Sequence, residues 1–115
     1  MRENVIQKKS YEFAKRIIKL YSYLSKEKKE FIISKQLLRS GTSIGANIEE
    51  AIGAQSKKDF VAKMNISYKE ARETHYWIRL LHDTEILTLK EKESIIYDCE
   101  ELIKILVKIL KTGKS

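Results

Sequence analysis

Proline is absent from this chain of 115 residues, and glycine occurs only four times. Proline and glycine mark the hairpins and loops of β-rich folds, whereas lysine, glutamate and leucine, which are frequent here, favour helix interiors. The shortage of turn residues therefore argues against a sandwich or barrel and favours long helices joined by short turns. The length suits one buried core, so we expect residues 1–115 to form a single domain.

Cysteine occurs once, at Cys99, which excludes an internal disulfide. The sequence also has no uninterrupted apolar run of about 18 residues, so no segment is expected to span a membrane. Its first residues contain no signal-like hydrophobic stretch. These three absences together predict a cytoplasmic protein in a reducing compartment.

Apolar residues recur every three or four positions in four segments, which is the pattern of helices that bury one face. The first segment begins between Asn4 and Ser10, either of which can cap a helix, and ends before the polar turn 25–30. The second runs from about Lys29 to Ile52. Both are long enough to be whole helices of a bundle.

Helix caps mark the other two segments. Ser56 precedes the third, with Asp59 at its third helical position, a variant of the capping box. The fourth opens with Thr88 and Glu91 in a complete capping box and stops at Gly113. Short connections favour neighbouring helices of opposite direction, so we expect an all-α, antiparallel up-down-up-down four-helix bundle.

Each segment has an apolar seam that should face the core. The inward positions are Phe13, Ala14, Ile17, Tyr21 and Leu24; then Ile33, Leu37, Gly41, Ile44, Ile48 and Ala51; then Phe60, Met64, Ser67, Ala71, Thr74, Ile78 and Leu81; and finally Ile95, Ile96, Cys99, Leu102, Ile103, Leu106, Val107, Ile109 and Leu110. The last stripe is wider than a small bundle needs, which predicts that copies of the chain associate.

Glycine is concentrated in the second segment, where Gly41 and Gly45 each weaken a helix by about 1 kcal/mol relative to alanine. No phosphate-binding loop pattern accompanies them, so a structural role is favoured. Two structural explanations stay open. Either a bulky side chain of the third segment approaches the thin helix, with Tyr68, Tyr76 and Trp77 as candidates, or the helix bends near Gly45.

Positive charge is uneven along the chain. Residues 1–39 contain eleven basic and four acidic side chains and so hold the whole net charge of +7. This asymmetry indicates a surface for polyanions, although lysines that merely keep a helix face soluble give the same pattern. The candidate phosphate-binding residues are Lys15, Arg16, Lys19, Lys26, Lys28, Lys29, Lys35 and Arg39.

Polar residues form a second stripe beside the seam of the second segment. We expect it to join polar residues of the third segment in an internal or interfacial network; the candidates are Arg39, Ser43, Asn47, Glu50, Lys69, Glu70 and Glu73. On this hypothesis Glu50→Ala would leave a buried cation unpaired and, if burial is complete, cost about 3–5 kcal/mol. The alternative is a solvated face with weak local ion pairs.

Catalytic and metal sites find no support in the sequence. The Glu-x-x-His motifs of di-iron bundles are missing, since Arg72 and Arg79 stand three residues before His75 and His82. Cys99 lies in an apolar stripe without a positioned base. We therefore predict no catalytic residue, no metal and no cofactor, a protein that is not an enzyme, and two histidines that are partly buried on a helix surface.

The stretches LLRSGTSIGANIEEAIGAQSKKDF (37–60) and KEARETHYWIRLL (69–81) resemble the four-helix-bundle family also called the 23S ribosomal RNA intervening-sequence proteins. SIGANIEEA (43–51) is the most specific piece, and Gly45 stands where many members have proline. The resemblance implies a small bacterial cytoplasmic protein without known enzymatic activity, which assembles as a homopentamer. The family has no agreed active site, so no catalytic residues carry over.

Some members of this family are encoded within insertions in ribosomal RNA genes, and others are accessory proteins of diversity-generating retroelements. Two functions therefore stay open. The first is a non-enzymatic assembly that binds RNA or DNA through phosphates, without base specificity because lysines act as point charges. The second is a scaffold or adaptor for proteins. The expected partners are other copies of the chain, a nucleic acid, and a reverse transcriptase or other nucleic-acid enzyme, with no membrane.

Overall fold

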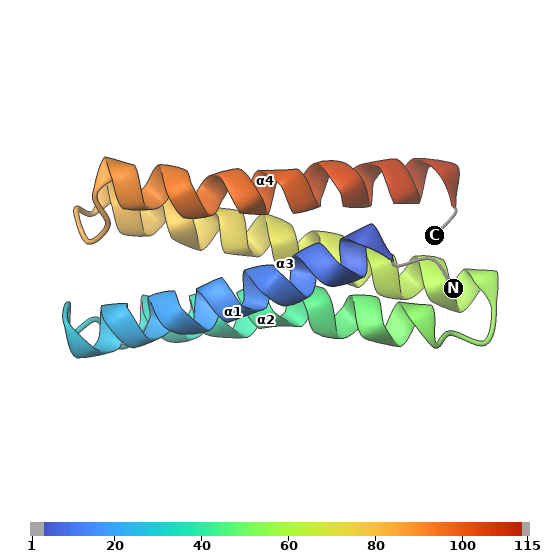
Figure 1. Ribbon diagram of the computed structural model, residues 1–115, viewed down its shortest axis with the longest axis horizontal. Helices are drawn as coiled ribbons and strands as arrows, with labels where there is room; N and C mark the ends of the chain where they lie inside the picture. The colour runs from blue at the N-terminus through green and yellow to red at the C-terminus, as the bar shows by residue number, and fades with distance from the viewer. Residues whose placement is uncertain (1–3, 114–115) are drawn as a thin grey trace.

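The computed structural model describes residues 4–113, which form four helices: α1 Val5–Lys26, α2 Ile33–Ile52, α3 Lys57–Asp83 and α4 Leu89–Thr112. The turns after α1 and α3 lie at one end of the molecule, while the α2–α3 turn lies at the other end, where α1 begins and α4 ends (Figure 1). The longest helix, α3, has 27 residues. It rises about 40 Å, nearly the full 43 Å length of the molecule.

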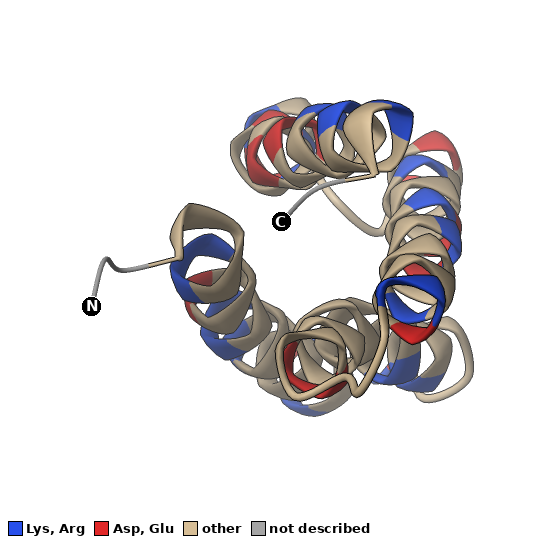
Figure 2. Ribbon diagram, turned by 90° about the vertical axis from the view of Figure 1, so that its right-hand side faces the viewer, with Lys and Arg blue, Asp and Glu red and all other residues tan. Residues whose placement is uncertain are grey.

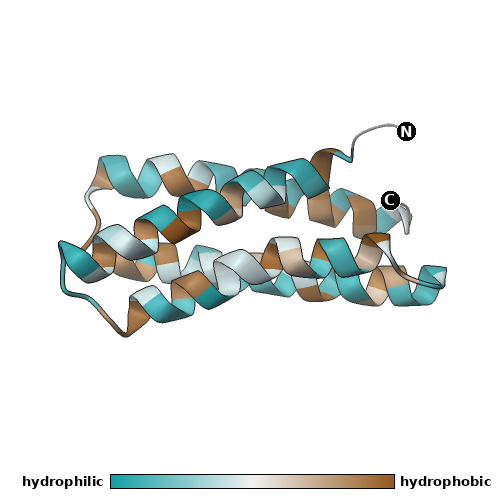
Figure 3. Cartoon of the chain, turned by 60° about the horizontal axis from the view of Figure 1, so that its bottom comes forward, coloured by the Kyte–Doolittle hydropathy of each residue, from teal (hydrophilic) through white to brown (hydrophobic). Residues whose placement is uncertain are grey.

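Each helix packs against two others around a common core. α2 contacts α1 and α3, and α4 contacts α3 and, over a shorter stretch, α1. Hydrophobic segments recur along every helix between hydrophilic ones (Figure 3). The prediction of an all-α protein with four helices is confirmed, and no strand occurs among residues 4–113. None of the helices in this range is long and apolar enough to cross a bilayer.

The predicted caps begin and end the helices. Asn4 accepts the backbone N–H of Gln7 and Ser56 accepts that of Asp59, at 3.1 and 3.0 Å. Thr88 forms the full capping box that opens α4. Gly113 ends α4 with φ +65°, a left-handed conformation that glycine adopts without strain.

The predicted start of α2 at Lys29 is wrong, because the helix begins at Ile33. Lys29 has φ 57°, which is incompatible with a right-handed helix. The Glu30 carboxylate then accepts the backbone N–H groups of Ile32, Ile33 and Ser34, at 3.1, 2.9 and 2.6 Å. Glu30 thus caps α2 through its side chain. The sequence showed the acid but not the left-handed residue before it.

The four seams are confirmed as the core. Among the positions predicted to face inward, none is exposed, and the fully buried ones include Ile17, Leu37, Ile44 and Ile78. Five of the nine members of the α4 stripe are buried within the chain and four are half-buried, so much of the stripe is covered without a second copy.

The glycines of α2 admit α1 and not the aromatic residues of α3, so that expectation is wrong. A Cβ built on Gly41 would lie 2.8 Å from both Cγ1 and Cγ2 of Ile17, and one on Gly45 would lie 3.3 Å from the Ser10 hydroxyl. α2 itself continues as one helix through both positions. Gly41 is therefore required by a contact with a fully buried isoleucine.

We predict that Gly41→Ala lowers the free energy of unfolding by about 1–3 kcal/mol through overpacking. Helix propensity alone predicts the opposite, a gain of about 1 kcal/mol. Ile17 cannot turn aside completely, because it is branched at Cβ and every staggered χ1 rotamer leaves at least one γ-carbon facing Gly41. Chemical denaturation of both proteins measures the difference.

Gly53→Ala is the matched control, since Gly53 has φ −87° and the nearest neighbour of a new Cβ is the Glu50 carbonyl oxygen at 3.8 Å. It should change stability by less than about 0.5 kcal/mol. In an Ile17→Ala background the cost of Gly41→Ala should disappear. A Gly41→Ala protein as stable as the wild type would contradict the contact.

Candidate functional site

The eight predicted phosphate-binding residues lie along α1, in the α1–α2 turn and at the start of α2. All are exposed except Arg16, which is half-buried. Lys15, Lys19 and Lys26 follow steps of four and seven and so share one face of α1. They do not form an isolated basic patch, since lysine and arginine segments occur on every helix with acidic segments between them (Figure 2).

Both predicted arginines are held by acids of the same chain. Arg16 bonds to the Asp98 carboxylate and donates to the Ser94 hydroxyl at 2.7 Å, which ties α1 to α4. Arg39 pairs with Glu70 at 3.1 Å and also with Glu73. A phosphate would have to displace these carboxylates, so the arginines are poorer phosphate ligands than the sequence suggested.

The lysines divide into engaged and unengaged ones. Lys15 pairs with Glu12 at 3.2 Å, and the Lys28 ammonium stands 5.9 Å from the centre of the Tyr23 ring. Four others are exposed, and no carboxylate of residues 4–113 lies within salt-bridge distance of them: Lys19, Lys26, Lys29 and Lys35. These are the cations of this region that a polyanion can reach without competition.

Lys90 joins this surface, although the sequence analysis missed it. It is the second residue of α4 and lines the same α1–α4 groove as Lys19. Glu91, in that groove, has a lowered pKa, chiefly because the backbone N–H of Thr88 bonds to its carboxylate. The net charge of successive sequence segments could not identify Lys90 as part of this surface, because Lys90 comes near α1 only in the folded bundle.

The predicted polar stripe is not one continuous network within the chain. Ser43 donates to the Arg39 carbonyl at 2.6 Å and Asn47 to the Ser43 carbonyl at 2.8 Å, both inside α2. Lys69 is exposed. The Glu50 side chain is 60% exposed and pairs with Lys63 at 2.9 Å. The complete burial on which the large loss for Glu50→Ala depended is therefore not met within the single chain, where the face is partly solvated.

The ion pairs of Arg39 with Glu70 and Glu73 cross between α2 and α3, as the Glu50–Lys63 pair also does. Burial alone would raise the pKa of Glu73, but hydrogen bonds from Arg39 and from the Trp77 indole, at 2.9 Å, lower it overall. The pKa of Arg39 is raised, mainly by the bond to Glu73. This cluster fixes α2 against α3 at the surface.

Buried hydroxyl groups make a second α2–α3 connection. The Thr74 hydroxyl lies 2.9 Å from that of Ser40, and the Ser67 hydroxyl donates to the Ile44 carbonyl at 2.8 Å. All four residues are buried. The sequence did indicate this connection, because Ser67 and Thr74 occupy seam positions. A hydroxyl group that is buried in a core needs a hydrogen-bond partner there.

The histidines and the cysteine have structural partners. His75 and His82 are half-buried, as predicted, and bond to Glu100 at 2.9 Å and to the Leu87 carbonyl at 3.1 Å. Burial, reinforced by nearby acids, raises the pKa of Cys99 to about 12, so its thiol stays protonated at neutral pH. In the described part of the chain no three metal-ligating side chains come together.

Four packed helices, with no strand between residues 4 and 113 and with basic side chains on the outside, define the class as a small all-α helical-bundle protein. Residues 2–108 match the family described as 23S rRNA-intervening sequence protein. The chain therefore belongs to the 23S rRNA-intervening sequence protein family.

A crystal structure from Bacteroides thetaiotaomicron is similar to this chain. It is described as a protein of unknown function from the S23 ribosomal protein family. The two share 56% sequence identity and superpose with a TM-score of 0.92, over 93% of this chain and 99% of that one. No curated protein matches the chain.

We predict that Glu73→Gln lowers the free energy of unfolding at pH 7 by about 0.5–1 kcal/mol, a value limited by solvent screening. Because the folded pKa of Glu73 is lowered, its stabilisation is full above the unfolded pKa and is lost as the pH falls through the folded one. Stability measured between pH 5 and pH 3 should therefore fall less steeply in the variant.

Glu50→Gln is the control, because it removes the same charge from an exposed pair. It should leave stability nearly unchanged at both ends of the pH range. Equal effects of the two substitutions would show that the Arg39 cluster contributes no more than an ordinary surface pair.

Proposed function

We propose that the protein is a non-enzymatic assembly that binds nucleic acid through its phosphate backbone. The observation that carries this proposal is a set of exposed lysines on α1, the α1–α2 turn and α2 that pair with no carboxylate of residues 4–113: Lys19, Lys26, Lys29 and Lys35. Lys90 lines the same α1–α4 groove as Lys19. Lysine ammonium groups attract phosphates as point charges and read no base sequence. Arg16 and Arg39 serve the fold in this proposal and leave phosphate binding to the lysines.

The proposal extends to the assembly, in which helices in up-down-up-down order form a bundle and bundles associate. Support for association comes from the family resemblance, which implies a pentamer. Ile32 and Tyr97, with exposed fractions of 75% and 69%, are apolar surface that a second copy could cover.

A mass measured by light scattering should be a multiple of the 13.5 kDa chain mass, five-fold for the pentamer. Because the association buries apolar surface, the mass should persist at high salt. A mass of one chain at micromolar concentration would rule out the assembly but not the lysine surface.

We predict that replacing Lys19, Lys26 and Lys29 together by glutamine weakens binding to generic duplex RNA or DNA and flattens its salt dependence. Each lost phosphate contact removes about 0.9 from the slope of log affinity against log salt concentration. Binding titrations at several salt concentrations between about 50 and 200 mM give this slope. Glutamine maintains helix propensity, so the fold should survive.

The matched control replaces Lys58, Lys108 and Lys111, three exposed lysines towards the opposite end of the bundle. It removes the same charge and should weaken binding less. Equal losses in the two triple variants would place the binding surface elsewhere, and no binding by the wild type would refute the proposal.

The second candidate function is a protein scaffold or adaptor. Phe31 and Ile32 favour it, since the turn that Glu30 caps holds both side chains in solvent, 53% and 75% exposed. A wild-type protein that retards neither RNA nor DNA at moderate salt would leave this candidate ahead. In either function the partner, nucleic acid or protein, binds at the α1–α2 end of the bundle.

A further inference from the structure

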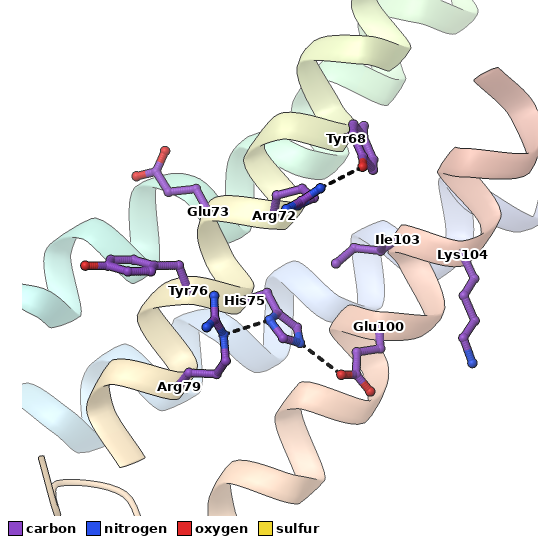
Figure 4. A pocket seen from close by; sticks show the side chains of 9 residues that line it. All are labelled: Tyr68, Arg72, Glu73, His75, Tyr76, Arg79, Glu100, Ile103 and Lys104. Atoms are coloured by element: carbon purple, nitrogen blue, oxygen red, sulfur yellow. Dashed lines mark hydrogen bonds and ion pairs between the residues drawn. The ribbon is translucent and has the colours of Figure 1, made fainter. Parts of the chain in front are cut away.

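A groove of about 850 Å³ runs between α3 and α4, away from the lysines of α1. Aromatic rings and cations line it together. Figure 4 shows Tyr68 on the side of α3 that faces α4, Tyr76 on the other side of α3, and Lys104 on α4, pointing away from α3. Tyr76 is 48% exposed. The proposed backbone binding by lysines makes no use of this groove.

The groove contains two arginine–tyrosine pairs in succession. The Arg72 guanidinium lies 5.8 Å from the centre of the Tyr68 ring and donates to its hydroxyl at 3.0 Å. The Arg79 guanidinium lies 5.8 Å from the centre of the Tyr76 ring. Each pair offers a π-face and a delocalised cation side by side, which suits a planar group that carries a negative charge.

The groove keeps a positive charge, because its three cations, Arg72, Arg79 and Lys104, outnumber its two acids, Glu73 and Glu100. Glu73 is bound by Arg39 and Trp77, and Glu100 by His75. No carboxylate of the described chain forms a salt bridge with Arg72 or Arg79. The groove is therefore complementary to an anion.

Hydrogen bonds hold the groove in one arrangement. Arg79 Nε donates to His75 Nδ1 at 3.1 Å, so Nδ1 is the acceptor and the ring proton sits on Nε2. That nitrogen lies 2.9 Å from a Glu100 carboxylate oxygen, to which it donates. The chain Arg79–His75–Glu100 connects α3 to α4 (Figure 4). A site ordered before binding loses less entropy when it binds.

We infer that the α3–α4 groove binds single-stranded nucleic acid, with unpaired bases stacked on Tyr68 and Tyr76 and phosphates beside Arg72, Arg79 and Lys104. This inference rests on the proposed function, because it takes the same polymer as the ligand. It adds a second site with a different selectivity, since stacking needs a base whose face is open.

The spacing of the two rings selects a single strand over a duplex. Eight positions separate Tyr68 from Tyr76, which is about 12 Å along a helix axis. Stacked bases are only about 3.4 Å apart along a strand, and their faces are covered by their neighbours. A strand with splayed bases can reach both rings, whereas a duplex offers neither ring a face.

The test compares three fluorescent probes at fixed moderate salt: a single-stranded RNA of ten uridines, a ten-base-pair RNA duplex, and uridine monophosphate. Tyr68→Leu with Tyr76→Leu removes the π-faces and keeps apolar bulk at the half-buried Tyr68. Single-strand affinity should fall about ten-fold for each ring, while duplex affinity stays unchanged. Tyr68→Phe with Tyr76→Phe keeps the rings and should restore affinity to within about two-fold of the wild type.

Tyr11→Leu is the matched control, since Tyr11 is an exposed tyrosine of α1 that does not line the groove. It should leave all three affinities unchanged. Arg72→Gln with Arg79→Gln should flatten the single-strand salt slope by about 0.7 for each contact. The Lys19, Lys26 and Lys29 triple variant should weaken single strand and duplex alike.

The outcomes separate the two claims. If the leucine variants bind the single strand as the wild type does while the lysine variant loses both ligands, the groove inference is overturned and the proposed function stands. Single-strand binding that needs the tyrosines, without any duplex binding, would support the groove and refute the lysine surface. Uridine monophosphate binding as tight as the decamer would overturn the two-ring strand site.

Discussion

The close contact between α1 and α2 at Gly41 is the constraint on which the bundle depends. Ile17 has no exposed surface and occupies the space that a side chain at position 41 would need. The same approach brings Ser10 against Gly45, one turn further along α2. Side chains at positions 41 and 45 would push α1 away from α2. The two glycines weaken α2 locally, but they allow α1 to pack closely against it.

This contact also sets the orientation of the basic surface. α1 is packed extensively on α2 but over a shorter stretch on α4, where Lys9–Glu101 and Arg16–Asp98 bridge the two helices. With Ile17 fixed inwards, the face of α1 that carries Lys15 and Lys19 must point to solvent. The lysine surface thus follows from the packing on the opposite side of the same helix.

Local sequence signals predicted most of the fold because caps and seams act through near neighbours. Asn4, Ser56, Thr88 and Gly113 each fulfil the predicted role. The start of α2 was missed because the left-handed Lys29 leaves no compositional mark. The sequence also did not show which helix packs against Gly41 and Gly45. That depends on which helices become neighbours in the folded bundle, and the structure shows that it is α1.

The site was less predictable, because its chemistry depends on pairs distant in the sequence. Arg16 meets Asp98 across 82 positions and Arg39 meets Glu70 across 31, and both pairings remove cations that looked available. The α3–α4 groove escaped notice for the same reason. Its tyrosines and arginines read as an ordinary helix surface until α4 supplies Glu100 and Lys104.

The central claim is that two separate faces contact one nucleic acid, lysines for its phosphates and tyrosines for its bases. A titration followed by NMR, with amide and aromatic-ring signals recorded as the uridine decamer is added, tests it most directly. The account predicts shifts at the α1–α2 end together with ring-proton shifts of Tyr68 and Tyr76, and only the first set with the duplex. Ring signals of Tyr68 and Tyr76 that stay still at saturation with the single strand would contradict it.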